Sequence, residues 1–201
     1  MRGTDLTDNS RTTAGILLFL LPAQFIIALV AGAAIAPGYS ISANAISDLG
    51  VIDTTAWLFN ASLFMAGLLN IFGGYFLYRS SGRGWILPVF VLAGLGAIGA
   101  AVFTLDIPGI HGLFALAAFV FFNVEAIACA SLVRGPLKAI SIVAGVIGLI
   151  FLVTHAVSDF GIMTLYGPIG HGGSERMIVY PALFWLMAFG GYLMAPFVAE
   201  R

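Results

Sequence analysis

Long runs of apolar residues dominate this chain, and their length decides what it can fold into. A helix needs about 20 apolar residues to cross about 30 Å of hydrocarbon. Backbone groups inside a bilayer must satisfy their own hydrogen bonds, and these runs lack the alternation of barrel strands, so each is predicted to be a helix. Six predicted spans result, covering residues 14–36, 57–78, 85–105, 111–133, 137–157 and 177–197.

The shortage of charge supports the same class of protein. Charged residues make up 8% of the chain, whereas soluble domains carry about 25%. We therefore predict one all-α domain, residues 1–201, folded as a six-transmembrane-helix bundle and multi-pass in the cell membrane. The first run exceeds the apolar core of a secretion signal, about 7 to 15 residues, and is expected to be retained as a span.

Charge and cysteine content exclude two further possibilities. The net charge of -1 argues against a nucleic-acid partner, because binding nucleic acid requires a concentrated basic face. The single cysteine, Cys129, excludes a disulfide within the chain.

The basic residues indicate the orientation of the bundle. With six spans, both termini share one side with the second-to-third and fourth-to-fifth connections, and these hold seven of the eight Lys and Arg residues. Only Arg176 falls on the opposite side. By the positive-inside rule, the first side is cytoplasmic, with both the N-terminus and the C-terminus inside.

Two similar polar segments lie on the predicted outer side. Residues 44–50 and 155–161 both contain a Ser-Asp-apolar-Gly element, and both follow spans that run in the same direction. A weak parallel repeat would bring them to a similar depth. In the second segment, His155 and Asp159 are four positions apart and share a face if the helix continues that far. Alternatively, Ser and Asp cap helix ends here and Gly turns the chain.

Further polar residues belong to the same predicted side. Pro108 and Gly109 set a tight turn that holds Asp106 at the end of one helix and His111 at the start of the next. The glycine-rich segment 160–174 carries His171. A segment of this kind can fold over a site as a lid.

Three charged residues near or within the spans are further candidates. Glu175 and Arg176 precede the last span. Arg176 is expected to pair with a neighbouring Asp, or else to hold a lipid phosphate or a substrate carboxylate. Glu125 lies inside the fourth span, about 13 Å from its inner end at about 1.5 Å per residue. An acid at this depth is costly and often functional, as a proton relay or as a neutral acid hydrogen-bonded across the bundle.

The candidate site residues fall into three groups. The candidate catalytic residues are Asp48, Asp106, His111, His155 and Asp159. The candidate ligand-binding residues are Ser47, Ser158, Glu175 and Arg176. The candidate metal ligands are His111, His155 and His171.

The order of these motifs resembles the domain-of-unknown-function 998 family of membrane proteins. The resemblance covers nearly the whole chain and is carried by residues 46–50, Phe59-Asn60, Asp106 with His111-Gly112, and Glu175-Arg176. It implies a six-helix membrane protein with no established activity. A looser similarity is to ceramidase-like membrane hydrolases, which combine Ser, Asp and three His around zinc. Those proteins carry paired histidines on one late helix, where this chain has His155 and Asp159.

Three functions are compatible with these residues. We expect a non-catalytic accessory, lipid-binding or assembly protein whose outward-facing Asp, His and Ser residues form a polar cluster. The alternative is an outer-leaflet lipid hydrolase in which His111, His155 and His171, with one Asp, hold zinc and leave a position for water. The third is a proton-coupled carrier that uses Glu125, although the broken mid-membrane helices typical of carriers are not evident.

The expected partners and cofactors follow from the same residues. Haem ligation by His111 and His155 is compatible with their outer positions on neighbouring spans. Membrane lipid is the expected partner, and a membrane-protein partner or a homo-oligomer remains open.

Overall fold

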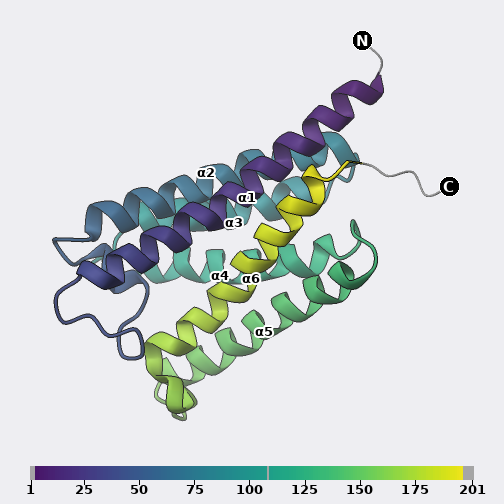
Figure 1. Ribbon diagram of the computed structural model, residues 1–201. Coiled ribbons are helices and arrows are strands. Elements are labelled where there is room, and N and C mark those ends of the chain that lie inside the picture. The colour runs from purple at the N-terminus through teal and green to yellow at the C-terminus, as the bar shows by residue number, and fades with distance from the viewer. Residues whose placement is uncertain (1–2, 108, 197–201) are drawn as a thin grey trace.

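The computed structural model describes residues 3–107 and 109–196, and this part of the chain is helical without strands. Its helices are α1 (Gly3–Ile35), α2 (Ala56–Ser81), α3 (Ile86–Val102), α4 (Ile110–Cys129), α5 (Pro136–Asp159) and α6 (Gly170–Met194) (Figure 1). Two short 3-10 turns, η1 (Ser47–Gly50) and η2 (Gly167–Ile169), lie in the connections. The all-α prediction is therefore confirmed.

Five of these helices, α1, α2, α4, α5 and α6, are long and apolar enough to cross a membrane. The span predicted at 85–105 is shorter in the structure, because α3 ends at Val102 and comprises 17 residues. At about 1.5 Å per residue α3 is about 25 Å long, slightly less than the hydrocarbon thickness. Four positions used in the sequence predictions lie outside the described residues: Arg2, Pro108, Phe197 at the end of the sixth span, and Arg201.

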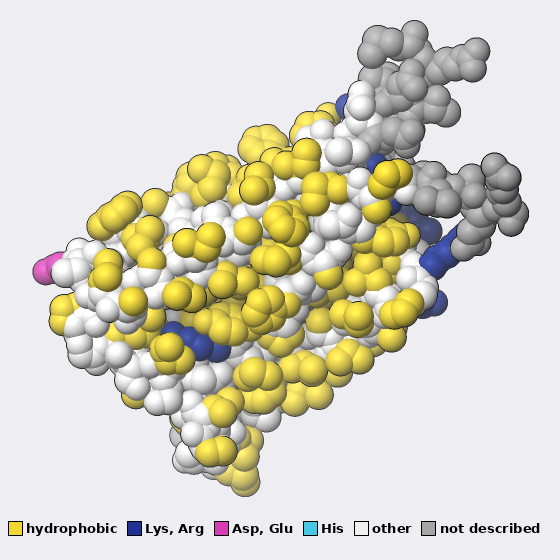
Figure 2. Space-filling view, viewed as in Figure 1, with side chains coloured by type: hydrophobic (Ala, Val, Ile, Leu, Met, Phe, Trp, Pro, Cys, Tyr) yellow, Lys and Arg dark blue, Asp and Glu magenta, His cyan; other side chains and the backbone are white. Residues whose placement is uncertain are grey.

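The helices form one bundle in which each helix packs against the next along the chain. Helix α6 also packs against α1 and α4, so the last helix closes the bundle onto the first (Figure 1). The start of α1 and the end of α6 lie at the same end of the bundle (Figure 1). Lys and Arg side chains gather at that end, and an acidic side chain marks the opposite end (Figure 2).

Small residues allow the helix backbones to approach closely. A Cβ atom at Gly67 of α2 would lie 2.5 Å from the carbonyl oxygen of Gly94 in α3, and one at Gly94 would lie 2.7 Å from that of Gly67. Gly15 of α1 and Gly190 of α6 face each other in the same reciprocal way. Close backbone contact of this kind replaces the hydrophobic driving force that is missing between helices in lipid.

A substitution at Gly96 tests this packing. A Cβ atom there would lie 2.5 Å from the backbone nitrogen of Ala118 in α4, and a backbone cannot move aside as a flexible side chain does. We expect Gly96→Ala to lower the free energy of unfolding by about 1–3 kcal/mol, measured as thermal stability in detergent. Gly191→Ala is the matched control, because nothing lies within 4 Å of that position. Equal stability of the two variants would contradict the packing at the α3–α4 contact.

Candidate functional site

The first turns of α6 organise the polar end of the bundle. The connection between α1 and α2, residues 36–55, lies against them, and the backbone nitrogen of Gly172 donates a hydrogen bond to the carbonyl oxygen of Ser42 at 2.9 Å. A Cβ atom at Gly170 would lie 2.3 Å from the Ser42 oxygen, and one at Gly172 would lie 2.0 Å from the Asn44 oxygen. Glycine is therefore needed here to let two backbones touch.

This contact corrects the expectation of a glycine-rich lid over residues 160–174. Helix α6 begins at Gly170 rather than near residue 177, so His171, Gly172 and Gly173 are helical. The glycines are compatible with a helix because the packed connection compensates for their low helix propensity. The non-helical part of the segment is short, and it ends in the turn η2.

Arg176 binds the connection to α6. Its side chain is buried, with 6% of its surface exposed. Nη1 donates to the carbonyl oxygens of Ile41 at 2.9 Å, Asn44 at 3.0 Å and Gly172 at 2.8 Å, and Nη2 donates to the hydroxyl of Tyr39. The expected pairing of Arg176 with an Asp is not found among the described residues, where the ion pairs involve histidine. The guanidinium donates instead to three backbone carbonyl oxygens and to the Tyr39 hydroxyl.

Tyr39 extends this network toward the turn. Its hydroxyl donates to the carbonyl oxygen of Ala45 at 2.8 Å while it accepts from Arg176. Burial raises the pKa of Tyr39 above its usual value, and the hydrogen bond from Arg176 only partly opposes this. The hydroxyl therefore stays protonated and able to donate. Sequence analysis did not identify Tyr39, whose place beside Arg176 is set by the folded connection.

Asp48 stabilises the turn that follows. Its carboxylate accepts from the backbone nitrogen of Ala45 at 2.9 Å and from the side chain of Asn44 at 3.1 Å. Both partners lie within four positions of Asp48, so this candidate catalytic carboxylate acts as a local turn-forming group. Ser158 is comparable, because its hydroxyl donates to Thr154 at 2.9 Å and accepts from the backbone of Leu165 at 2.8 Å.

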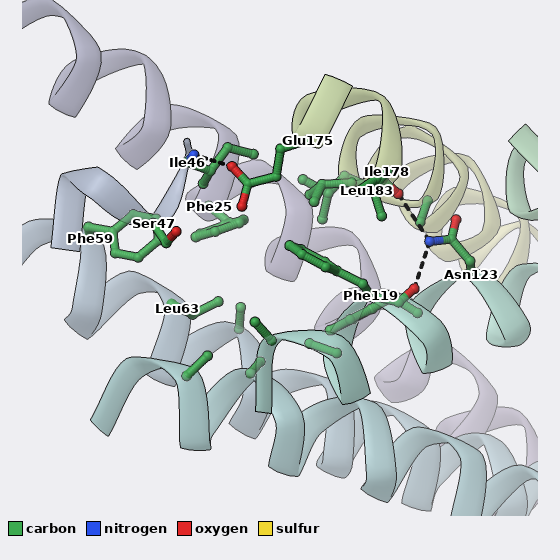
Figure 3. Close-up of a pocket in the computed structure, with 18 of the residues that line it drawn as sticks. Phe25, Ile46, Ser47, Phe59, Leu63, Phe119, Asn123, Glu175, Ile178 and Leu183 are labelled. Atoms are coloured by element: carbon green, nitrogen blue, oxygen red, sulfur yellow. Dashed lines mark hydrogen bonds between the residues drawn. The ribbon is translucent and has the colours of Figure 1, made fainter. Parts of the chain in front are cut away.

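Glu175 reaches from α6 to the same turn. One carboxylate oxygen accepts from the backbone nitrogen of Ile46, and the side chain is buried with 5% of its surface exposed. The other oxygen points toward a cavity inside the bundle (Figure 3). Ser47, the next residue of the turn, also lines this cavity.

The cavity lies between α1, α2, α3, α4 and α6 and is mainly apolar. It offers about 80 Å³ to the centres of water-sized molecules, where one buried water needs about 10–15 Å³. One end carries Ser47, His111 and Glu175. The walls include Phe25, Phe59, Leu63, Phe119 and Leu183 (Figure 3). A cavity with polar residues at one end and apolar walls has the shape and chemistry to hold an amphiphilic molecule, with its polar head at that end.

His111 is held at the wall of this cavity by the preceding helix. Its Nδ1 lies 2.8 Å from the carbonyl oxygen of Phe103 and 3.2 Å from that of Ala100. Since carbonyl oxygens only accept, Nδ1 carries a hydrogen, and in the neutral ring Nε2 bears the lone pair. Asp106, predicted to accompany His111, is instead exposed and accepts from the hydroxyl of Thr104.

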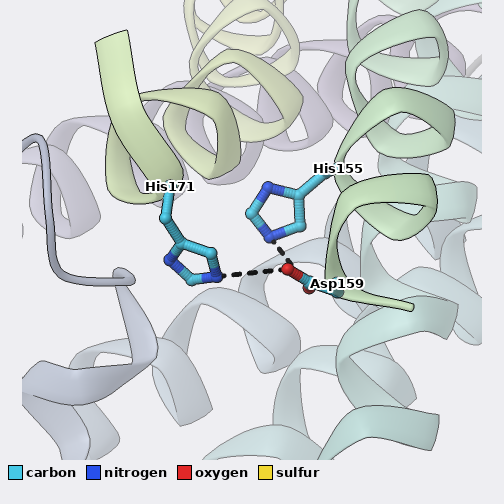
Figure 4. A group of neighbouring side chains, drawn as sticks. All are labelled: His155, Asp159 and His171. Carbon is cyan, nitrogen blue, oxygen red and sulfur yellow. Dashed lines mark ion pairs between the residues drawn. The ribbon is translucent and has the colours of Figure 1, made fainter. Parts of the chain in front are cut away.

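A second polar cluster joins α5 to α6. His155 Nε2 lies 3.3 Å from one carboxylate oxygen of Asp159, and His171 Nε2 lies 3.5 Å from the other (Figure 4). Helix α5 continues to Asp159, so His155 and Asp159 share a face. Of the three predicted metal ligands, the structure brings His155 and His171 together with Asp159, and His111 is not in this group.

Tyr166 completes the cluster, although sequence analysis did not identify it. Its hydroxyl donates to Asp159, and its ring lies 5.2 Å from that of His171 and 5.5 Å from that of His155. Burial, together with the hydrogen bond to Asp159, raises the pKa of Tyr166 to about 12. The Tyr166 hydroxyl therefore stays protonated and donates a hydrogen bond that orients the Asp159 carboxylate.

The two Ser-Asp segments therefore differ in structure but meet at one helix. Residues 47–50 form the turn η1, whereas Ser158 and Asp159 end α5. The first segment reaches α6 through Ile46 and Glu175, and the second reaches it through Asp159 and His171. His171 and Glu175 are four positions apart, so the two clusters lie about one helical turn from each other.

Glu125 lies away from both clusters, deep between α2 and α4. It has no exposed surface, and the side chain of Asn70 donates to its Oε1 at 2.7 Å and to the carbonyl oxygen of Phe90 at 3.0 Å. A cross-bundle hydrogen bond was one of the two interpretations of Glu125. Asn70 was not identified, although an amide in the middle of an apolar run is a recognisable signal of such contacts.

Long apolar helices and small-residue packing define the class as a multi-pass helical membrane protein. The chain belongs to the family described as "Protein of unknown function (DUF998)", whose model matches residues 19–192. The family resemblance predicted from the order of the motifs is therefore confirmed. The chain matches no curated protein and no solved structure.

Substitution of Arg176 tests whether it holds the 36–55 connection in place. Hydrogen bonds to a charged group contribute about 1.5–3 kcal/mol each, so we expect Arg176→Ala to cost about 3 kcal/mol or more of stability. Arg176→Lys should cost less than Arg176→Ala, because an ammonium keeps the charge and some of the hydrogen-bond donors, although it lacks the planar arrangement of the guanidinium. Proteolysis within the 36–55 connection should be fastest in Arg176→Ala, slower in Arg176→Lys and slowest in the unaltered protein.

The matched control is Arg79→Ala. Arg79 is exposed and donates to the hydroxyl of Tyr75 on its own helix, and surface changes of this kind stay within about 0.5 kcal/mol. If Arg176→Ala melted at the same temperature as Arg79→Ala, the proposed anchoring role would be wrong.

Proposed function

We propose that this protein binds an apolar chain of a membrane lipid in its internal cavity, with the lipid head at the outer end of the bundle. In this proposal all six helices cross the cell membrane, and both termini are cytoplasmic. The role is that of a non-catalytic lipid-binding protein. The observation that carries the proposal is the apolar cavity with Ser47, His111 and Glu175 at one end.

The packing of α3 supports six spans. Helix α3 lies between α2 and α4 in the bundle, and nine of its residues are buried. It is about 25 Å long, and a short span is accommodated by thinning of the bilayer at a modest cost. Six is an even number of crossings, so the start of α1 and the end of α6 then lie on the same side of the membrane.

The charges support the orientation. Four exposed basic residues lie in or beside the two connections on the side of the chain ends: Arg79, Arg83, Arg134 and Lys138. Arg83 donates to the hydroxyl of Ser131 at 3.3 Å, so these two connections lie next to each other. Basic residues concentrated at one end are the feature by which the positive-inside rule assigns the cytoplasmic face.

The polar end of the cavity favours a particular lipid chemistry. Glu175 and Ser47 offer hydrogen-bonding oxygens, and His111 offers the lone pair of Nε2. The Arg176 guanidinium donates to backbone carbonyls and to Tyr39 instead. A carboxyl group without a free cation beside it favours a head that donates hydrogen bonds, such as a hydroxyl or an amine, over a phosphate.

Filling the cavity tests the proposal. Ala182 lines it from α6 and has a buried side chain. We expect Ala182→Phe to reduce binding of a long-chain alcohol in detergent by about tenfold or more, because each buried CH₂ contributes about 0.8 kcal/mol. Ala139→Phe is the control, since Ala139 is exposed on α5 and lines no part of the cavity.

A photoactivatable long-chain alcohol adds a direct test in the unaltered protein. We expect the label on the cavity walls of α4 and α6, at residues such as Phe119 and Leu183. Competition by unlabelled alcohol should remove that label. Labelling confined to outward-facing residues such as Leu113 and Phe184, or an unchanged affinity in Ala182→Phe, would overturn the proposal.

A further inference from the structure

The cluster of His155, Asp159 and His171 contains the donor atoms of a metal site. Each residue offers one ligand atom, and these atoms all lie within 4.8 Å of one another. Imidazole nitrogens and carboxylate oxygens are the usual ligands of zinc, and two histidines with one carboxylate is a recurrent three-ligand set.

The spacing of the donors fits a common centre. Zinc is bound at about 2.0–2.1 Å by nitrogen and oxygen, so two ligands of a tetrahedral ion lie about 3.3 Å apart. His155 Nε2 lies 3.3 Å from one Asp159 oxygen and His171 Nε2 lies 3.5 Å from the other, and one donor atom from each of the three residues lies within 4.8 Å of the other two. Both Nε2 atoms point toward the Asp159 carboxylate, that of His155 from α5 and that of His171 from α6 (Figure 4). Binding one ion requires these side chains to rotate until the three donor atoms converge on it.

The surroundings of the cluster also match a metal site. The Tyr166 hydroxyl donates to Asp159, and hydrogen bonds to a ligating carboxylate fix its orientation and raise metal affinity. His155 is buried, whereas the side chains of Asp159 and His171 are 44% and 37% exposed. One side of the cluster is therefore open to entry of an ion and leaves room for water as a fourth ligand.

We propose that His155, Asp159 and His171 bind a divalent transition-metal ion, with Zn²⁺ as the best match to this donor set. The fold positions the ligands through three elements. The last turns of α5 present His155 and Asp159, the connection brings Tyr166 beside them, and the start of α6 at Gly170 supplies His171. This set replaces the three-histidine ligand set predicted from the sequence.

The metal site is independent of the lipid-binding proposal. None of His155, Asp159 and His171 lines the cavity. His111 lines the cavity and does not belong to the metal cluster. His111 is therefore a matched control, since it is a histidine of the same bundle whose loss leaves the proposed ligands intact.

The test is direct metal binding by the full chain in detergent. We expect about one Zn²⁺ per chain by elemental analysis after exposure to Zn²⁺ and desalting. Co²⁺ should give the visible absorption bands of a low-symmetry site with nitrogen and oxygen ligands. His155→Ala, His171→Ala and Asp159→Asn should each weaken Zn²⁺ binding by more than about tenfold, and His111→Ala should leave it unchanged.

Folding of each variant is checked by its elution volume and by its melting temperature in chelator. The Tyr166→Phe variant keeps all three ligands and removes only the hydroxyl, so it should weaken Zn²⁺ binding without abolishing the Co²⁺ bands. Wild-type protein that binds Zn²⁺ no more tightly than the His155→Ala/His171→Ala double variant would overturn the proposal. So would an equal loss of binding in His111→Ala.

Discussion

The buried guanidinium of Arg176 makes the contacts on which the polar end of the bundle depends. By donating to Ile41 and Asn44 it holds residues 36–55 against the first turns of α6. That position brings the backbone of Ile46 to Glu175 and places Ser47 at the end of the cavity. A charge removed from water this far is tolerated only with its hydrogen bonds satisfied. The connection and the helix therefore stabilise each other.

Hydrogen bonds also link helices in the interior. Among the described residues, Asn70 donates to Glu125, and Trp185 donates to the hydroxyl of Ser141 at 2.7 Å. The cavity that we propose as a lipid site is mainly apolar, with Ser47, His111 and Glu175 gathered at one end.

The sequence predicts the helices well, because the length of each apolar run is enough to indicate a helix. It predicts much less about the contacts between the helices. The start of α6 was misplaced because Gly170 and Gly172 were interpreted as loop residues, whereas their contact with residues 42–44 sets the helix boundary. His155 and Asp159 are close because both lie on α5 at helical spacing. The separation of His111 from His171 depends on how α4 and α6 pack, which spacing along the chain cannot reveal.

The most direct test of the central claim, that this polar end faces out of the cell, is cysteine labelling in intact cells. In a Cys129→Ala background, Asp53→Cys adds a thiol at an exposed position of the 36–55 connection, and Gly84→Cys adds one at an exposed position between α2 and α3. We expect a membrane-impermeant maleimide to label Asp53→Cys at once and Gly84→Cys only after permeabilisation. Labelling of Gly84→Cys in intact cells, with Asp53→Cys protected, would contradict the orientation and the outer location of both proposed sites.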